Sequence, residues 1–142
     1  MFNKILVAID GSEVSKKALD VAIDEAKAWK AELHAIYVIE TGMLSSIPVD
    51  NTLEVIYSLL ENEGTGTLEE SRNTASDAGI ELHTHITQGH AGNEILTLAE
   101  DMGANLIILG SHGKSNVDRF LIGSVTTYVV RHSSINTLVV RS

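Results

Sequence analysis

The amino-acid sequence predicts an α/β fold: a single doubly wound domain over residues 1–142, with a parallel sheet of five strands in the order 3-2-1-4-5 and helices on both faces. Two observations lead to this prediction. Short aliphatic runs alternate along the chain with segments of helical periodicity, which is the pattern of consecutive β-α-β units. The chain has 142 residues, 44% of them hydrophobic and only 4% aromatic, so its length and composition suit one aliphatic core.

The amino-terminal part contains the first two expected strands and the helix between them. Ile5–Ile9 is a continuous aliphatic run that ends at Asp10-Gly11, as is typical of a strand buried on both faces. Ser12 is placed to cap the helix that follows, and Leu33–Ile39 forms the second strand. The helix has apolar residues three and four positions apart, at Val14, Ala18, Val21, Ala22 and Ala26.

A loop at Thr41–Asp50, which contains the only proline of the chain, leads to a long helix expected at about Thr52–Ala78. Gly64 and Gly66 lie inside this helix, where each costs about 1 kcal/mol relative to alanine. These two glycines leave open whether the helix is bent or split. Gly79 is placed to end it.

The carboxyl-terminal half continues the alternation. Ile80–Thr87 is the expected third strand, followed by a helix at about Asn93–Met102 and a fourth strand at Leu106–Leu109. The last two elements are a helix at about Ser124–His132 and a strand at about Asn136–Val140. In the predicted order, the third and fifth strands form the two edges of the sheet.

The predicted fold also locates a candidate site. In doubly wound sheets, ligands bind beyond the carboxyl ends of the strands, at the point where the direction of winding reverses. The predicted strand order places this point between the first and fourth strands. The candidate site therefore combines the loop after Ile9 with the loop that follows Leu109.

The second of these loops has features that suit a phosphate group. Gly123-Ser124 opens a helix, whose free N–H groups and dipole favour an anion, and Lys114 and Arg119 add local positive charge. The alternative is that the glycines and serines only serve the turn and the helix start. The glycines and hydroxyls in question are Gly110, Gly113, Gly123, Ser111, Ser124, Thr126 and Thr127.

Three known motifs are absent from these loops. Gly113–Ser115 resembles the end of the phosphate loop G-x-x-x-x-G-K-[ST], but Ile108 stands where that motif needs its first glycine. The first loop lacks the G-x-G-x-x-G of dinucleotide-binding folds. Ser111 and His112 are not accompanied by the G-x-S-x-G elbow of a serine hydrolase.

Charge and composition exclude further classes. Lys plus Arg number 10 and Asp plus Glu 19, and the net charge of −9 disfavours binding to nucleic acid or to an anionic membrane. The sequence has no cysteine, which excludes disulfides, thiolate metal sites and cysteine nucleophiles. No apolar run approaches the roughly 18–20 residues of a membrane-spanning helix, and the amino-terminal run is too short for a signal peptide. We therefore expect a cytoplasmic protein.

Three histidines in and after the third expected strand are candidate metal ligands. His83 and His85 share one face of an expected edge strand, and His90 follows them in the sequence. Because an edge strand is solvated, we interpret these side chains as solvated rather than as a metal cluster. His34 and His132 show no partner pattern in the sequence.

Several segments resemble the universal stress protein family. The run G-S-H-G, nine residues and then G-S matches that family's nucleotide-binding signature G-x2-G-x9-G-[ST]. The opening K-I-L-V-A-I-D-G-S, the segment A-N-L-I-I-L-G-S-H-G-K and the closing T-L-V-V-R resemble its first strand, fourth strand and last strand. The resemblance implies a Rossmann-like, adenine nucleotide alpha hydrolase-like fold and membership of the ATP-binding branch. One departure is Thr137, where family members commonly have proline.

The resemblance also assigns roles to residues. It implies that Asp10 lies near the ribose and a Mg²⁺ or Mn²⁺ ion, with Ala8 and Ile9 beside it, although Asp10 can instead simply shape the turn. It implies that the backbone of Val38 recognises adenine. The remaining matches would border the ribose and the phosphates of ATP: Leu109, Gly110, Gly113, Gly123, Ser124, Val125 and Thr126.

The last strand predicts a partner. Thr137 and the apolar run Leu138, Val139 and Val140 lie at a predicted sheet edge, which invites pairing with another chain. In the family this strand pairs with its copy, so the resemblance implies a homodimer; the alternative is an edge shielded by its own helix. The Met43–Val49 loop either covers the nucleotide or adds to the dimer contact.

Three functions follow from these observations and the resemblance. The first is an ATP-binding regulator in the stress response, whose shape or partners depend on the nucleotide. The second is slow ATP hydrolysis or self-phosphorylation on Ser111 or Ser124. The third is a nucleotide-independent interaction module. AMP or a cyclic nucleotide stays open as the ligand, because recognition of adenine does not depend on the number of phosphates.

Overall fold

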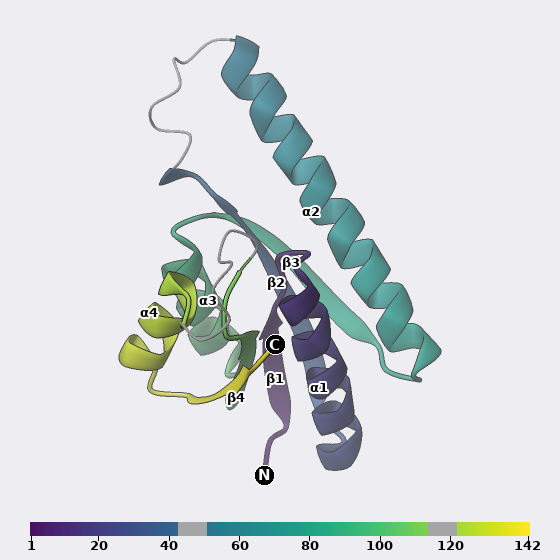
Figure 1. The fold of residues 1–142 in the computed structure, drawn as a ribbon. Coiled ribbons are helices and arrows are strands. Elements are labelled where there is room, and N and C mark those ends of the chain that lie inside the picture. The colour runs from purple at the N-terminus through teal and green to yellow at the C-terminus, as the bar shows by residue number, and fades with distance from the viewer. Residues whose placement is uncertain (43–50, 114–121) are drawn as a thin grey trace.

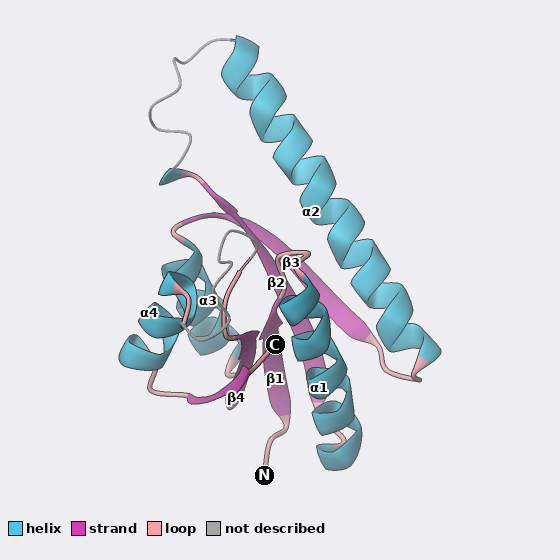
Figure 2. Cartoon of the chain, viewed as in Figure 1, coloured by secondary structure: helices cyan, strands magenta, loops and turns pink. Residues whose placement is uncertain are grey.

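Strands and helices alternate along the parts of the chain that the computed structural model describes, which are residues 1–42, 51–113 and 122–142 (Figures 1 and 2). The strands are β1 (Lys4–Ala8), β2 (Glu32–Glu40), β3 (Leu82–Gly89), β4 (Leu106–Gly110) and β5 (Asn136–Val140). The helices are α1 (Glu13–Trp29), α2 (Asn51–Asp77), α3 (Ala91–Met102) and α4 (Ser124–His132). The Met43–Val49 loop, Lys114 and Arg119 lie outside the described residues.

The five strands form one parallel sheet in the order β3-β2-β1-β4-β5, which confirms the predicted fold class. The central strand is β1, whose Leu6 is in register with His34 of β2 and with Ile107 of β4. From β1 the chain winds first towards β3 and then, after β3, crosses to β4 on the other side. The winding therefore reverses between β1 and β4.

Alternate residues of the sheet contact different helices. Ile5, Val7 and Ile108 pack into a core with α1 and α2, whereas Leu6 and Ile107 pack into a second core with α3 and α4. Figure 1 shows the two pairs of helices on opposite faces of the sheet. The central strands β1 and β4 are continuous aliphatic runs because both of their faces are buried.

The helix ends show why the elements begin and end where they do. Ser12 caps α1, and its hydroxyl accepts a hydrogen bond from the N–H of Ser15 at 3.2 Å, as predicted. His90 caps α3 in the same way, with Nδ1 accepting from the N–H of Asn93 at 3.2 Å. This cap starts the helix at Ala91 rather than at Asn93. Gly103 ends α3 in the left-handed region, at φ 71°.

The turn after α2 shifts the start of the third strand. Gly79 has φ 82°, and the N–H of Ile80 donates back to the carbonyl of Ala75 at 2.9 Å. Because Ile80 is still part of this helix-ending turn, β3 begins at Leu82 and not at the predicted Ile80. It extends to Gly89, two residues beyond the predicted end.

The structure resolves the open question about α2, which is one continuous helix of 27 residues. Splitting at the two glycines is therefore ruled out. Gly64 is buried against the sheet, and a Cβ there would lie 2.7 Å from Cδ1 of Tyr37 and 2.9 Å from Cδ1 of Ile86. Gly66 faces open space. Gly64 thus allows the helix to pack closely on β2 and β3, whereas no packing explains Gly66.

None of the helices in the described residues is long and apolar enough to cross a membrane.

The two glycines of α2 give a matched pair for measurement. We expect Gly64→Ala to lower the free energy of unfolding by about 1–2 kcal/mol, because overpacking against Tyr37 outweighs the gain in helix propensity. We expect Gly66→Ala to raise it by up to about 1 kcal/mol, because its Cβ meets nothing. Urea denaturation of both variants checks the opposite signs. Equal effects of the two substitutions would contradict the packing argument.

Candidate functional site

The two loops that the sequence singled out come together at the carboxyl ends of β1 and β4. A Cβ built on Gly113 would lie 2.9 Å from Oδ2 of Asp10, so the backbone after β4 runs directly past this carboxylate. The two residues are far apart in the sequence and meet because β1 and β4 are neighbours in the sheet. This region, where the winding reverses, is called the crevice below.

Asp10 shapes the turn between β1 and α1. Its Oδ1 accepts a hydrogen bond from the N–H of Ser12 at 2.9 Å, and Gly11 between them has φ 84°. One carboxylate oxygen of Asp10 therefore has the turn-forming role that the sequence offered as the alternative. The other oxygen lies against Gly113. One side chain thus holds the turn and also presents a negative charge at the crevice.

The three glycines of the signature have different local roles. A Cβ on Gly110 would lie 2.9 Å from both methyl groups of Val14, so this glycine is needed for the contact between β4 and α1. A Cβ on Gly123 would lie 3.1 Å from Cα of His112. The N–H of Gly123 donates to the carbonyl of Ser111 at 2.7 Å. Only at Gly113 would the added carbon crowd the Asp10 carboxylate directly.

The start of α4 is held against the end of β4. Gly123 is the N-cap of α4 and makes no side-chain capping bond. The hydroxyl of Thr126 donates to the carbonyl of Gly110 at 2.7 Å, and Thr126 is buried. Thr126 therefore positions the helix, because its hydroxyl is hydrogen-bonded to the backbone of β4. The first turn of α4 contains no acidic residue, so the positive end of the helix dipole is not offset by a carboxylate of that turn.

Two buried polar atoms beside the crevice lack partners among the described residues. They are Oγ of Ser111, a residue with 0% exposure, and Nε2 of His112. Leaving such a group unpaired costs about 1–3 kcal/mol, so most buried polar atoms in proteins are paired. The sequence pattern predicts the hydroxyl of Ser111 as a donor to a phosphate. It indicates no such role for His112, which was a candidate only for a hydrolase triad. The two orphaned atoms are the kind of feature that a polar ligand satisfies.

The backbone of Ser111 connects the crevice with the edge of the sheet. Its N–H donates to the carbonyl of Val140, the last residue of β5, at 2.8 Å, and its carbonyl accepts from Gly123. Among the described strands, β5 pairs only with β4, and Thr137 and the three apolar residues after it are half-buried. A groove of about 370 Å³ adjoins β5 and is lined in part by Ile122 and Val130.

The backbone of Val38 is directed towards the crevice side of β2. The carbonyl of Ile36 accepts from the N–H of Ile9 at 2.9 Å, so Ile36 directs its backbone groups towards β1. Backbone groups two residues apart along a strand share a side, so those of Val38 are directed the same way. The β1–β2 register ends at the pair Ala8 and Ile36. Val38 therefore presents its N–H and carbonyl beyond the end of β1.

The remaining predicted residues lie along the same edge, but several of their side chains point into the cores. Ile9 packs with α1 and α2, whereas Leu109 and half-buried Ala8 pack with α3 and α4, so their backbones face the crevice more than their side chains do. Ser124 is exposed and Val125 half-buried in the first turn of α4.

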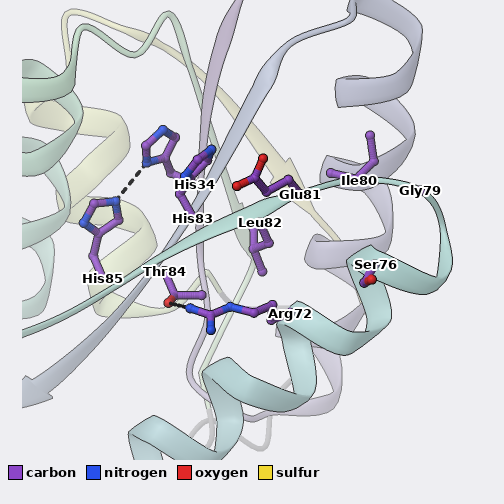
Figure 3. Close-up of a pocket in the computed structure, with 10 residues that line it drawn as sticks. All are labelled: His34, Arg72, Ser76, Gly79, Ile80, Glu81, Leu82, His83, Thr84 and His85. Atoms are coloured by element: carbon purple, nitrogen blue, oxygen red, sulfur yellow. Dashed lines mark hydrogen bonds between the residues drawn. The ribbon is translucent and has the colours of Figure 1, made fainter.

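A second polar cluster lies away from the crevice, at the amino ends of β2 and β3. Nδ1 of His34 is 2.8 Å from Nε2 of His85, and the rings of His34 and His83 stack with centroids 4.6 Å apart (Figure 3). Nε2 of His34 is 3.2 Å from Oε1 of Glu32. The sequence shows no partner pattern for His34, because the strand register that brings these residues together is not visible in it.

The contacts in this cluster shift the pKa values of two of its members, Glu32 and His85. The hydrogen bond from His34 holds the pKa of the Glu32 carboxyl below its usual value. Burial, together with the neighbouring His34 and His83, lowers the pKa of His85. His90 does not join the group; it caps α3 and its ring contacts Tyr128.

The fold and the crevice define a Rossmann-like α/β protein with a glycine-lined cradle where the winding reverses. Residues 1–141 match the universal stress protein family, and the chain belongs to that family.

Individual relatives cover nearly the whole chain. It is 36% identical over 141 residues to Universal stress protein MJ0531 of Methanocaldococcus jannaschii, a match that covers 99% of this chain and 83% of that protein. The solved structure of MJ0577, a universal stress protein from the same organism, matches with a TM-score of 0.85 at 33% identity, covering 100% of this chain and 97% of that one. A universal stress protein solved in complex with cAMP matches with a TM-score of 0.71 at 26% identity, covering 99% of this chain and 97% of that one.

The crevice geometry predicts opposite consequences for two buried hydroxyls. We expect Ser111→Ala to leave the stability of the nucleotide-free protein unchanged or to raise it by up to about 1 kcal/mol, because the hydroxyl that it removes is buried and unpaired. We expect Thr126→Val to cost about 1–3 kcal/mol, because it removes the bond to Gly110. Chemical denaturation measures both. A loss at Ser111 as large as that at Thr126 would show that the Ser111 hydroxyl has a structural partner.

Proposed function

We propose that this protein is an ATP-binding universal stress protein that acts as a nucleotide-dependent regulator of the stress response in the cytoplasm. The observation that carries the proposal is the contact between Gly113 and Asp10, which sets a glycine backbone beside a carboxylate where ligands bind in doubly wound sheets. The orphaned polar atoms of Ser111 and His112 support it, because a polar ligand would satisfy them. The relative solved in complex with cAMP supports an adenine nucleotide as the class of ligand.

The residues present fit a nucleotide with its metal ion. The glycine-lined backbone after β4 and the free first-turn N–H groups of α4 would hold the phosphates, with Ser111 as a further donor. Val38 would present its backbone to the adenine, and Ala8, Ile9, Leu109 and Gly110 would border the ribose. The phosphate contacts would come from Gly113, Gly123, Ser124 and Val125. Thr126 would act indirectly, by holding α4 in place.

Asp10 would hold Mg²⁺ or Mn²⁺, which prefer carboxylate ligands and reduce the charge of the phosphates. The carboxylate is fixed by its bond to Ser12, so it is positioned before any ion arrives. The same engagement makes Asp10 a poor general base for a water molecule. The geometry therefore favours binding and a change of state over rapid hydrolysis.

The edge of the sheet supports a homodimer through β5. The carbonyl of Val140 faces β4, because it accepts from Ser111, so the backbone groups of Val139 and Thr137 face outwards. An outward N–H at Thr137 is compatible with the proline that the family resemblance leads us to expect at this position. A second copy pairing with this edge would cover the half-buried apolar residues of β5.

Nucleotide binding can be tested at Gly113 without removing a polar group. In Gly113→Ala, either the new Cβ enters the crevice or the Asp10 carboxylate moves. We therefore expect the Kd for ATP with Mg²⁺ to rise roughly 10–100-fold. Gly66→Ala, whose Cβ meets open space, is the matched control and leaves the Kd unchanged. Isothermal titration calorimetry measures both, with AMP and cAMP as competing ligands.

Two results would reject parts of this proposal. Wild-type protein that binds none of the three nucleotides, and releases none on denaturation, excludes an adenine nucleotide function. If Gly113→Ala abolishes binding but leaves the stress phenotype and the partners of the protein unchanged, the nucleotide-independent interaction module is the correct function.

The dimer edge can be tested by removing one outward N–H. We expect Val139→Pro to convert the dimer to a folded monomer, because proline lacks this donor and is tolerated on edge strands. Leu138→Pro is the contrasting variant, since its N–H faces β4 and its loss should destabilise the fold. Sedimentation velocity and circular dichroism separate the outcomes. A Val139→Pro variant that remains dimeric would place the interface elsewhere.

A further inference from the structure

The histidine cluster at the amino ends of β2 and β3 has the composition and the spacing of a metal site. We propose that Glu32, His34 and His83 bind a divalent transition-metal ion of the Zn²⁺ class. One ligand atom from each of these residues lies within 4.8 Å of the other two. The site is separate from the nucleotide crevice, which lies at the carboxyl ends of the strands, and the proposal does not depend on nucleotide binding.

The strand register assembles the site. His34 and His83 are register partners on adjacent parallel strands, so both imidazoles project from the same face at the same level. Glu32 precedes His34 by two residues and therefore shares that face. Its Oε1 is 3.2 Å from Nε2 of His34 and 3.8 Å from Nε2 of His83. All three residues thus place a ligand atom within 4.8 Å of the others, and they do so from hydrogen-bonded strands rather than from loops.

His85 acts as a positioning residue. Its Nε2 lies 2.8 Å from Nδ1 of His34, and the two rings are nearly parallel, at 16°. In the metal-bound state, Nε2 of His34 would give its lone pair to the ion in place of the proton that bonds Glu32, and Nδ1–H of His34 would donate to Nε2 of His85. Metal-bound histidines usually have such an outer partner on the second ring nitrogen.

The ligand set selects the class of ion. Two imidazoles with one carboxylate bind Zn²⁺ and related ions and leave a position open for water. Mg²⁺ and Ca²⁺ prefer oxygen ligands and do not match two histidines. The side chains of Glu32 and His83 are 43% and 40% exposed, so an ion can reach them from solvent and both can move to close around it. The side chain of His34 is only 13% exposed and anchors the site.

The surroundings are open and polar. The cluster borders a hollow of about 800 Å³ that lies over β3 and is also lined by Glu81. Figure 3 shows the three histidines grouped together, while Arg72 reaches the hydroxyl of Thr84, at 2.6 Å, away from them. Lys4 is the register partner of Glu32 and the cation nearest along the strands, and its Nζ donates to the carbonyl of Met102 at 3.1 Å.

A metal ion here would connect the edge strand β3 to β2. An ion that binds the folded protein but not the unfolded chain stabilises the fold. The ion would join residues 32–34 to residue 83, so it would close a long segment of chain that includes α2. The expected consequence is a rise in the melting temperature on addition of Zn²⁺.

The test is titration of Zn²⁺ into the full-length, chelator-treated, nucleotide-free protein by isothermal titration calorimetry. We expect one saturable site per chain, which Mg²⁺ does not compete for. Glu32→Gln and His83→Gln should each weaken Zn²⁺ binding by at least about 10-fold, and His85→Gln should weaken it by about the same factor or less. His132→Gln, which changes a histidine at the end of α4, is the matched control and should leave the affinity unchanged.

Thermal melts of the same variants provide a second readout. Zn²⁺ should raise the melting temperature of the wild type and of His132→Gln, and should not raise that of His83→Gln. Circular dichroism without metal checks that each variant folds, and ATP titrations should be the same for all of them. Absence of saturable Zn²⁺ binding, or equal affinities for wild type, Glu32→Gln and His83→Gln, overturns the proposal.

Discussion

Burial of β1 between β2 and β4 is the constraint on which the rest of this structure depends. Ile5, Leu6 and Val7 have 0% exposure because helices cover both faces of the sheet and strands cover both edges of β1. A strand in that position has no freedom of register, since a shift by one residue would exchange its two faces. Its carboxyl end is therefore a fixed point, and Asp10 and the backbone after β4 meet there as a result.

The close approaches of the backbone depend on that rigid frame. Gly64, Gly110 and Gly113 each sit where a Cβ would lie less than 3.0 Å from another side chain, and each does so at a different contact. In the first two cases the glycine allows a helix to pack on the sheet. In the third it keeps the carboxylate of Asp10 beside bare backbone. A single residue type thus serves both the packing of helices on the sheet and the chemistry of the site.

Much of the architecture could be predicted because it follows from local patterns. The bounds of α4 and β5 agree with the prediction, and the convergence of the two crevice loops follows from the strand order. Side-chain contacts that depend on strand register or on the orientation of a helix could not be predicted. The cluster around His34 depends on the register of β2 against β3, and the role of Gly64 depends on the face of α2 that meets the sheet.

Two side chains form hydrogen bonds that the sequence pattern does not predict. A histidine is not an expected helix cap, so His90 gave no sign that α3 starts at Ala91. The hydroxyl of Thr126 suggested a ligand contact, but burial directs it to a backbone carbonyl instead. Such hydrogen bonds depend on which donors remain unpaired after the chain has folded, and a linear sequence does not show this.

The backbone of Ser111 couples the crevice directly to the edge of the sheet. Its N–H donates to the carbonyl of Val140 and its carbonyl accepts from the N–H of Gly123, so this one residue joins the edge strand to the start of α4. These two groups belong to successive peptide planes on either side of one Cα, so only the φ and ψ angles of Ser111 separate the bond to the edge strand from the bond to α4. The connection between the crevice and the edge strand is therefore short, and it lies at the rim of the fold rather than in the interior of the sheet.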